Sequence, residues 1–406
     1  MIQSDRKEVC VTIPRVQSKS IDLDYLLNAI VRENSILFKI LEMINCISCN
    51  FPYPDDHVPY RCPKCGDLFD FSQWPHYDPD LIEDEPGIWR YRHTFGLPDH
   101  APTVFLGEGN TPLVWSKVMN REIAFKLEFL NPSGSFKDRG TALMVSFLKS
   151  KRVKGAMDDS SGNAGASFAA YASFTNLRAK IYLPAYASGP KRDQIEAYGA
   201  TVIPVSGPRS RASAAVQKAA EAGEVYASHA MLPQGLPGFA SIAYELLQQL
   251  KRPPGTIILP VGQGSQLLAL GRAFQSMHGD GLIDVIPRLI GVQAKACAPF
   301  YAASIHRNSA QESLAEGKTL AEGVRILKPH RLDAVVNQVQ RSGGKFLVVD
   351  EEEILPGQQS LARKGLYVEP TSSIVWSGLH QVIEQVPDPI VVILTGSGLK
   401  TTSINL

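Results

Sequence analysis

The sequence has no long hydrophobic run and no excess of charge of either sign. No stretch of about 18 consecutive apolar residues occurs, and the first residues show no secretion-signal pattern, so we expect neither a membrane span nor export. The formal net charge is +1 over 406 residues, which provides no basic surface for nucleic acid and no acidic tail. We therefore expect a cytoplasmic protein whose partner is a small molecule, not a membrane or a nucleic acid.

Cysteine is scarce, and four of the six cysteines form two CxxC pairs. Cys46 and Cys49 form the first pair and Cys62 and Cys65 the second, with twelve residues between the pairs. In a chain without a secretion signal this spacing indicates a metal site. Four thiolates suit a tetrahedral zinc ion, and a closed set of four cysteines leaves no open position for catalysis. We predict a structural zinc ribbon over residues 46–70; structural cysteines without a metal are the alternative.

The chain also lacks the Gly-Lys-Ser/Thr sequence of a nucleoside-triphosphate loop. It has instead three loops of small residues, each after an apolar run: "SSGNAG" (160–165), "GQGSQ" (262–266) and "TGSG" (395–398). Backbone N–H groups in such a loop, at the start of a helix, bind phosphate or carboxylate. Each loop taken alone is also what ordinary turn geometry produces, so the set carries more weight than any member.

One lysine lies among small and turn-forming residues, in "NPSGSFKDRG" (131–140). A surface lysine needs no such setting, whereas a lysine that forms a Schiff base must be neutral and held close to a cofactor. Lys137 is therefore the candidate catalytic residue. Together with a phosphate loop, a carboxylate loop and the Thr395 hydroxyl, it provides what pyridoxal phosphate bound to an amino acid requires.

The rest of the chain alternates short apolar runs, such as "KIYLP", "TIILPV" and "PIVVILT", with Ala- and Leu-rich helical segments. This alternation predicts parallel sheets covered by helices, in two α/β lobes with a ligand between them. We predict an extension at 1–45, a connector at 71–105, a first lobe at 106–250 and a second lobe at 251–406. Apolar residues at helical spacing between Leu23 and Ile44 predict a helix that packs internally or binds a partner; a natural start at Met43 is the third possibility.

The order of the motifs resembles the threonine synthase family, within the pyridoxal-phosphate enzymes of the tryptophan-synthase-β fold type. The likeness runs from about Cys46 to the C-terminus and is carried by "LGEGNTPL", "NPSGSFKDRG", "SSGNAGAS", "GVQA", "LAEGVRI", "VEPTSS" and "LTGSGLK". It implies a two-lobed fold type II enzyme with the cofactor in the cleft, a preceding zinc ribbon and a homodimer.

The resemblance also implies the roles of individual residues. Lys137 would be the Schiff-base lysine, Asn163 would hydrogen-bond the 3-hydroxyl of the cofactor, and Thr395 would face its ring nitrogen. The residues that would hold the cofactor phosphate are Gly262, Gln263, Gly264, Ser265 and Gln266. Those that would hold the substrate carboxylate are Ser160, Ser161, Gly162, Ala164 and Gly165.

The family reaction implied is that of a lyase, which converts O-phosphohomoserine and water to threonine and phosphate. The sequence departs from the family at Gly235, where many members carry an arginine for the phosphate, and at Ala164, where some place a hydroxyl. Cations that could compensate are Lys191, Arg192, Arg209 and Arg211. Related elimination or replacement reactions therefore stay open: cysteate or cysteine formation from phosphoserine, or ammonia release from threonine or diaminopropionate. A non-catalytic threonine-synthase-like binding protein is the further alternative.

Overall fold

The structure is a computed structural model that describes residues 43–305 and 317–401. The helix expected in the N-terminal extension falls on residues 1–42, outside the described part, and Ile44 itself begins a strand. Among the described residues, no helix has both the length and the apolar character that crossing a membrane requires.

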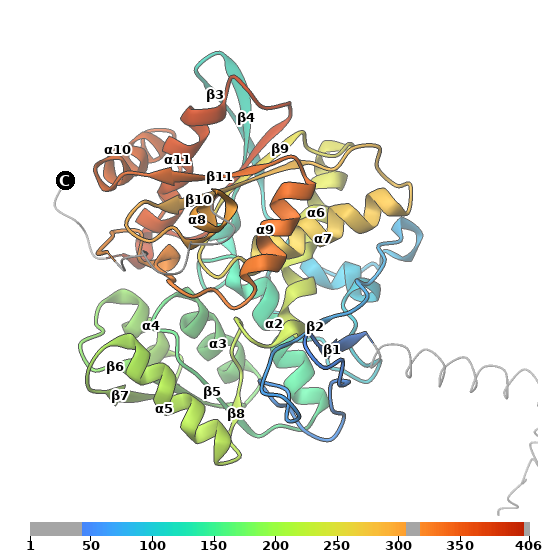
Figure 1. Cartoon of the computed structure of the whole chain (residues 1–406), viewed down its shortest axis with the longest axis vertical. Helices are drawn as coiled ribbons and strands as arrows, with labels where there is room; N and C mark the ends of the chain where they lie inside the picture. The colour runs from blue at the N-terminus through green and yellow to red at the C-terminus, as the bar shows by residue number, and fades with distance from the viewer. Residues whose placement is uncertain (1–42, 306–316, 402–406) are drawn as a thin grey trace, which may run out of the picture. The chain divides into compact units, whose positions relative to one another are not determined.

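The helices and strands carry the labels of Figure 1. The strands are β1 (Ile44–Cys46), β2 (Phe69–Phe71), β3 (Leu113–Val118), β4 (Arg121–Lys126), β5 (Gly155–Asp158), β6 (Arg178–Pro184), β7 (Thr201–Val205), β8 (Val225–Tyr226), β9 (Thr256–Pro260), β10 (Arg288–Ala294), β11 (Lys345–Val349) and β12 (Ile390–Ile393). The α-helices are α2 (Lys137–Ser150), α3 (Asn163–Phe174), α4 (Pro190–Ala197), α5 (Arg209–Glu221), α6 (Leu236–Leu250), α7 (Ser265–Gly279), α8 (Pro299–Ile305), α9 (Leu332–Arg341), α10 (Glu351–Ala362) and α11 (Pro370–Val382). The 3-10 helices are η1 (Pro79–Leu81), η2 (Gly87–Thr94), η3 (Glu128–Leu130), η4 (Pro233–Gly235), η5 (Glu322–Val324) and η6 (Gly398–Lys400).

The larger sheet has the strand order β11-β10-β9-β12-β4-β3 and is parallel except for the β3–β4 pair. Its central strand β9 is buried along its whole length, as the uninterrupted apolar sequence predicts for a strand covered on both faces. Successive side chains of β9 enter different cores: Ile257 and Leu259 pack with residues of α7 and α9, whereas Ile258 packs with residues of α10 and α11. Because neighbouring side chains on a strand point to opposite faces, helices cover both sides of this sheet.

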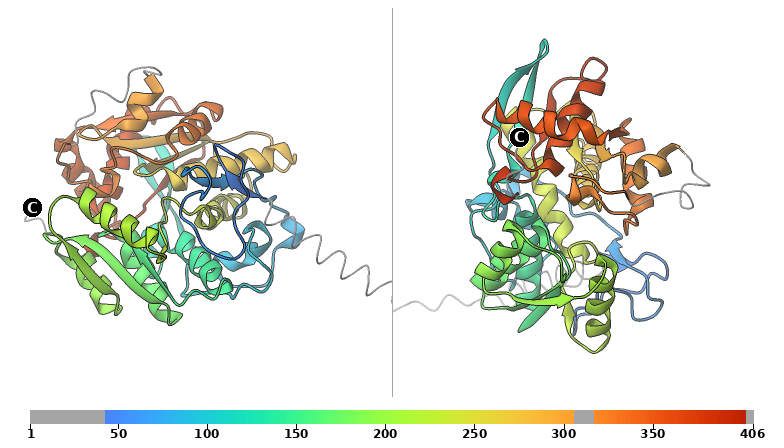
Figure 2. Two further views of the ribbon diagram at one scale, coloured as in Figure 1. Left: turned by 60° about the horizontal axis from the view of Figure 1, so that its bottom comes forward. Right: turned by 90° about the vertical axis from the view of Figure 1, so that its left-hand side faces the viewer.

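The smaller sheet has the order β7-β6-β5-β8 and is parallel throughout. Helix α5 contacts three strands of this sheet, and α3 contacts β6. Helix α2 packs against both α3 and α6. Figure 2 shows the two sheets from further directions, with the green strands of the smaller sheet apart from those of the larger one. The predicted fold class, parallel α/β sheets covered by helices, is confirmed.

The two sheets do not follow the predicted lobe ranges (106–250 and 251–406). Strands β3 and β4 precede residue 130, yet β4 pairs with β12, and both belong to the larger sheet. After β4 the chain passes through η3 to α2, whose first residue is the candidate lysine. Helix α2 packs against α3, which contacts the smaller sheet, and against α6, which contacts α7 beside the larger sheet.

Candidate functional site

Lys137 is the first residue of α2, and the turn before it is fixed by several hydrogen bonds. The carboxylate of Asp138 accepts bonds from Ser133 N (2.6 Å), Ser133 Oγ (2.5 Å) and Ser167 Oγ (2.6 Å). Gly134 has a φ of +83°, and a Cβ there would lie 2.8 Å from the Lys400 side chain, so the turn requires glycine. Lys137 therefore projects from a backbone that is held on both sides.

A buried ion network anchors the same helix to the neighbouring elements. The Arg139 guanidinium donates to both carboxylate oxygens of Glu128 (2.7 and 2.8 Å) and of Glu245 (2.7 and 2.8 Å). Lys126 on β4 donates to Glu245 at 2.7 Å, and all four side chains are buried. Because every charge in the network has a partner at hydrogen-bond distance, their burial is compensated.

The amine of Lys137 lies beside two aromatic rings and within the field of two acids. Its Nζ is 4.5 Å from the centre of the Phe136 ring and 5.6 Å from that of Phe239. Desolvation lowers the pKa of Lys137 from its usual 10.5 to about 8, and the negative charges of Asp158 and Glu369 oppose this shift only in part. A large fraction of this amine is therefore neutral slightly above physiological pH.

Asn163, the first residue of α3, is hydrogen-bonded to Glu369, the residue that precedes α11. Its Nδ2 donates to Glu369 Oε1 at 2.7 Å, and Lys191 Nζ lies 2.7 Å from Glu369 Oε2. Glu369 is 2% exposed, and its backbone N–H donates to Gly396 O at 3.0 Å. A Cβ on Gly396 would collide with Glu369 Oε1, so the small residue permits this contact.

The loop that contains Thr395 lies directly against the lysine turn. Phe136 N donates to Thr395 O (3.0 Å), and Ser397 N donates to Gly134 O (3.0 Å). The Thr395 backbone is itself held by Ser372 Oγ, which accepts from Thr395 N at 2.9 Å. Lys137, Asn163 and Thr395, three residues singled out in the sequence, are therefore brought together.

The loop 262–266 follows β9, which pairs in parallel with β12, the strand that leads to Thr395. The two loops thus leave the same edge of the larger sheet, as expected for the carboxyl ends of neighbouring parallel strands. A Cβ on Gly262 would lie 2.5 Å from Gly323 O, and Gly323 N donates to Thr371 Oγ1 at 2.9 Å. Gly264 has a φ of +83° and directly precedes α7, so the loop is built as a helix N-terminus.

Buried polar atoms around these loops have no hydrogen-bond partner within the described residues. They are Asn163 Oδ1, Ser135 Oγ and both amide atoms of Gln266. Since buried polar groups of a native protein are nearly always paired, unpaired atoms from three converging segments indicate a polar ligand. Pyridoxal phosphate fits them: the loop offers backbone amides to the phosphate, and Asn163 offers a carbonyl oxygen to a hydroxyl.

Two titratable groups near Lys137, the buried Asp158 and the half-buried His229, were missed by sequence reasoning. Asp158 ends β5, is 1% exposed and has Oδ1 without a partner in the described chain; burial, followed by the charge of Asp159, raises its pKa to about 7. Burial, and then the charge of Lys137, holds the pKa of His229 well below its usual value. The "DDSS" sequence placed Asp158 directly before a predicted loop, whereas no local pattern indicates His229.

The backbone of the lysine helix lies close to Gly235, where the family pattern has an arginine. A Cβ on Gly235 would lie 3.1 Å from Gly140 O, and a Cβ on Gly140 would lie 2.5 Å from the Phe239 ring. Of the cations considered as substitutes, Lys191 reaches Glu369, whereas Arg192 bonds Ala187 O and Glu196 on its own helix. Arg209 and Arg211 are exposed, although the charge of Arg209 acts on Asp158 and His229.

The four cysteines converge as predicted. Cys46 Sγ lies 3.3 Å from Cys65 Sγ and Cys49 Sγ lies 3.6 Å from Cys62 Sγ, and all four sulfurs are within 4.8 Å of one another. Zn–S bonds of about 2.3 Å in a tetrahedron require sulfurs about 3.8 Å apart, so the arrangement fits zinc. We call residues 43–72, with these ligands and strands β1 and β2, the four-cysteine module.

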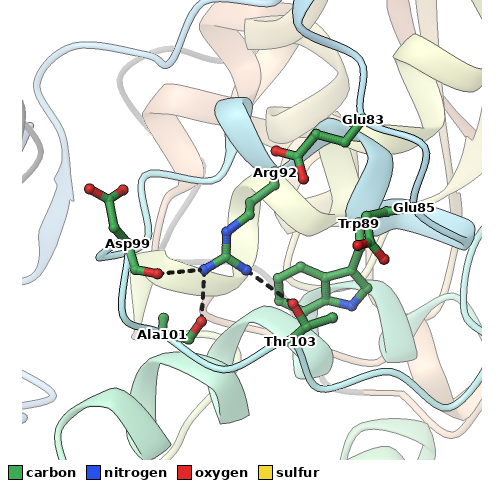
Figure 3. A pocket seen from close by; sticks show the side chains of 7 residues that line it. All are labelled: Glu83, Glu85, Trp89, Arg92, Asp99, Ala101 and Thr103. Atoms are coloured by element: carbon green, nitrogen blue, oxygen red, sulfur yellow. Dashed lines mark hydrogen bonds between the residues drawn. The ribbon is translucent and has the colours of Figure 1, made fainter. Parts of the chain in front are cut away.

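A separate hollow of about 340 Å³ lies on the connector and contains none of the predicted residues (Figure 3). Its one arginine, Arg92, already donates to Thr103 Oγ1 (3.2 Å), Asp99 O (3.2 Å) and Ala101 O (2.7 Å). With that cation engaged and Glu83 and Glu85 at its rim, the described residues that line the hollow offer no free cation to an anionic substrate.

Comparison with known proteins agrees with this geometry. The family profile described as "Pyridoxal-phosphate dependent enzyme" matches residues 104–396. A threonine synthase of Methanocaldococcus jannaschii is 32% identical, with 87% of this chain and 92% of that protein covered, and one of Methanosarcina acetivorans is 30% identical, with 88% and 92% covered.

Two solved structures share the fold. A maize serine racemase superimposes with a TM-score of 0.63 at 21% identity, covering 72% of this chain and 89% of that one. A serine racemase from Dictyostelium discoideum superimposes with a TM-score of 0.62 at 20% identity, covering 72% and 93%. The chain belongs to the pyridoxal-phosphate-dependent enzymes and, within them, to the threonine synthase family.

Proposed function

We propose that the protein is a lyase that uses pyridoxal phosphate, bonded through Lys137, to remove a leaving group from an L-amino acid. The observation that carries the proposal is the state of the Lys137 amine. It lies between two aromatic rings, at a helix start held by Asp138 and Arg139, with its pKa lowered to about 8. A neutral, immobilised amine is what attack on a carbonyl carbon requires.

The other residues divide into cofactor and substrate groups. The backbone amides of 262–266 would hold the cofactor phosphate, Asn163 would hold its hydroxyl, and Thr395 its ring nitrogen. When bound, pyridoxal phosphate supplies the electron sink that stabilises negative charge at the α-carbon. The amides of 160–165, at the start of α3, would hold the substrate carboxylate. Lys137 would move the proton of the α-carbon, a task suited to a pKa near the working pH.

The first candidate substrate is O-phosphohomoserine, because the relatives with about 30% identity are threonine synthases. Phosphate would leave from the γ-carbon and water would add at the β-carbon, while the γ-carbon gains a proton and becomes the methyl group of threonine. In place of the missing arginine, Lys191 is the cation connected to Asn163, through its ion pair with Glu369. An ammonium at this position would stabilise a departing phosphate by a charge-assisted hydrogen bond.

The second candidate is ammonia release from threonine or diaminopropionate, and two observations favour it. Position 235 carries glycine with the Gly140 carbonyl 3.1 Å from where a Cβ would lie, so it provides no cation for a phosphate, and the charges acting most directly on Lys137 are the carboxylates of Asp158 and Glu369. Such surroundings favour a hydroxyl or an amine over a phosphate dianion on the substrate side chain.

The test begins with the cofactor and then compares substrates. The wild type should bind pyridoxal phosphate and turn yellow, and borohydride reduction should leave the pyridoxyl group on the peptide that contains Lys137. Lys137→Ala should remain colourless. Phosphate release from O-phosphohomoserine and O-phosphoserine is then measured beside ammonia release from threonine and diaminopropionate. A wild type that binds no pyridoxal phosphate would refute the proposal.

A pair of variants distinguishes the candidates. If O-phosphohomoserine is the substrate, Lys191→Met should raise its KM by about tenfold or more, since a charge-assisted bond to phosphate is lost. Arg192→Met is the matched control, because Arg192 bonds its own helix and the Ala187 carbonyl. Equal effects of both changes would exclude Lys191 as the phosphate ligand. The homodimer and the cytoplasmic location stay predictions, and size-exclusion chromatography with light scattering tests the former.

A further inference from the structure

Arg331 is a buried arginine that no sequence motif contains. It precedes α9, is 6% exposed, and its guanidinium bonds two segments far away in the sequence. Toward the four-cysteine module, it donates to Phe69 O (2.8 Å) and lies 3.3 Å from Asp70 Oδ2. Toward the loop after β8, it donates to Ala230 O (2.6 Å) and Met231 O (2.9 Å).

The bonded loop continues into the segment beside Lys137, residues 229–239, which we call the 229–239 wall. His229 lies close enough for the charge of Lys137 to act on its ring. Gly235 packs against the Gly140 carbonyl of the lysine helix, and the Phe239 ring lies 5.6 Å from Lys137 Nζ. The carbonyls held by Arg331 are therefore at the start of the wall that borders the reacting amine.

The other end of the contact leads directly to a metal ligand. In the β1–β2 ladder Cys46 is the register partner of Phe69, whose carbonyl accepts from Arg331. The next residue, Asp70, is already paired with Arg272 through two bonds, of 2.7 and 2.9 Å. Because Arg272 neutralises Asp70, that carboxylate does not require a second arginine, and the bonds specific to Arg331 are those to the three carbonyls.

We propose that Arg331 is a positioning residue: it fixes the 229–239 wall to the four-cysteine module, so that an intact module sets how the wall receives the amino-acid substrate. The inference rests on the proposed function, since it assigns the wall to the substrate of Lys137. It follows that the module acts on catalysis from outside the site, through the pairing of Cys46 with Phe69 in the β1–β2 ladder and the hydrogen bonds of Arg331 to Phe69, Ala230 and Met231.

The test compares Arg331→Met with Arg272→Met in the zinc-loaded holoenzyme. Each variant removes one guanidinium from Asp70, but only the first frees the Ala230 and Met231 carbonyls. Three quantities are measured: zinc and pyridoxal-phosphate content, KM and kcat for the amino acid that the substrate panel identifies, and amide hydrogen exchange of the peptide 228–235.

Arg331→Met should keep both cofactors, raise KM on the order of tenfold through misplacement of the wall, and expose the 228–235 amides to exchange. Arg272→Met should lower the melting temperature while KM and the exchange of 228–235 stay as in the wild type. Arg331→Lys, which keeps one donor, should fall between the two. The same changes in both methionine variants, or an unchanged KM and exchange in Arg331→Met, would overturn the inference.

Hydrogen exchange separates this inference from the proposed function. If the wild type binds no pyridoxal phosphate, the proposed function fails, whereas faster exchange of 228–235 in Arg331→Met alone would still show that the arginine orders the wall. If Arg331→Met does not fold, Arg331→Lys and the chelator-treated wild type replace it. Both should then show faster exchange at 228–235 than Arg272→Met, and protection equal to that of the control would refute the role.

Discussion

Replacing the candidate lysine with methionine should stabilise the apoprotein while abolishing cofactor attachment. Desolvation lowers the pKa of Lys137 from 10.5 to about 8. A shift of about 2.5 units, at about 1.36 kcal/mol per unit, corresponds to roughly 3 kcal/mol of destabilisation of the protonated native state. Because the side chain is partly exposed, this figure is an upper bound, and Lys137→Met should gain about 1–3 kcal/mol at pH 7.

The sign of the pH dependence follows from proton binding. Between pH 8 and 10.5 the unfolded chain holds a proton on this lysine that the native protein has released. The free energy of unfolding of the wild-type apoprotein therefore rises with pH across this window, and the cost is present in full below it. Lys137→Met removes this contribution, so the difference between variant and wild type should be largest at pH 7 and should shrink toward pH 10.

The measurement is urea unfolding of cofactor-free, zinc-loaded protein at pH 7, 8 and 10, followed by far-UV circular dichroism. Lys154→Met is the matched control, since Lys154 is an exposed lysine that follows the same helix. The reasoning is refuted if Lys137→Met is no more stable than the wild type at pH 7, or if its advantage does not depend on pH.

Three further outcomes are expected. Asp158→Asn removes a carboxylate that raises the pKa of Lys137, so the pH at which pyridoxal phosphate attaches half-maximally should move below about 8; an unchanged or higher midpoint would contradict the electrostatic argument. Chelation of the four-cysteine module should lower the melting temperature, while the absorbance of bound pyridoxal phosphate remains; prompt loss of that absorbance in a folded protein would argue against a structural metal. Arg139→Met leaves the buried Glu128 without a cationic partner and Glu245 with Lys126 alone, and it should cost about 3–5 kcal/mol in urea unfolding; a loss under about 1 kcal/mol would show that the network is not needed.

Much of the site could be predicted from the sequence because its parts are local. Four cysteines in two CxxC pairs bring their own sulfurs close, and the structure gathers them within 4.8 Å. A run of small residues between an apolar strand and a helix specifies a helix N-terminus, as at Gly264 before α7. The role of Lys137 is likewise indicated by its immediate neighbours in a turn-forming segment. In parallel α/β folds such loops gather at the carboxyl ends of the strands, so their order along the chain predicts their meeting in space.

What the sequence could not indicate depends on contacts between distant residues. The Asn163–Glu369 bond joins residues 206 positions apart, and Arg331 reaches Phe69 across 262 positions. The sequence also did not indicate which strands form each sheet. Strand β4 lies in the segment predicted for the first lobe, but it pairs with β12, which lies in the segment predicted for the second.

The amino-acid sequence by itself therefore determined which residues are candidates for the chemistry: the four cysteines, the lysine and the loops of small residues. Only the tertiary structure decided the electrostatics, since the pKa of Lys137 depends on which rings exclude water from it and which carboxylates face it. The physical reason is the distance along the chain over which the interacting residues are spread. Backbone geometry and ligand spacing are properties of a few consecutive residues, whereas desolvation and buried charge are properties of the packed interior, to which every segment contributes.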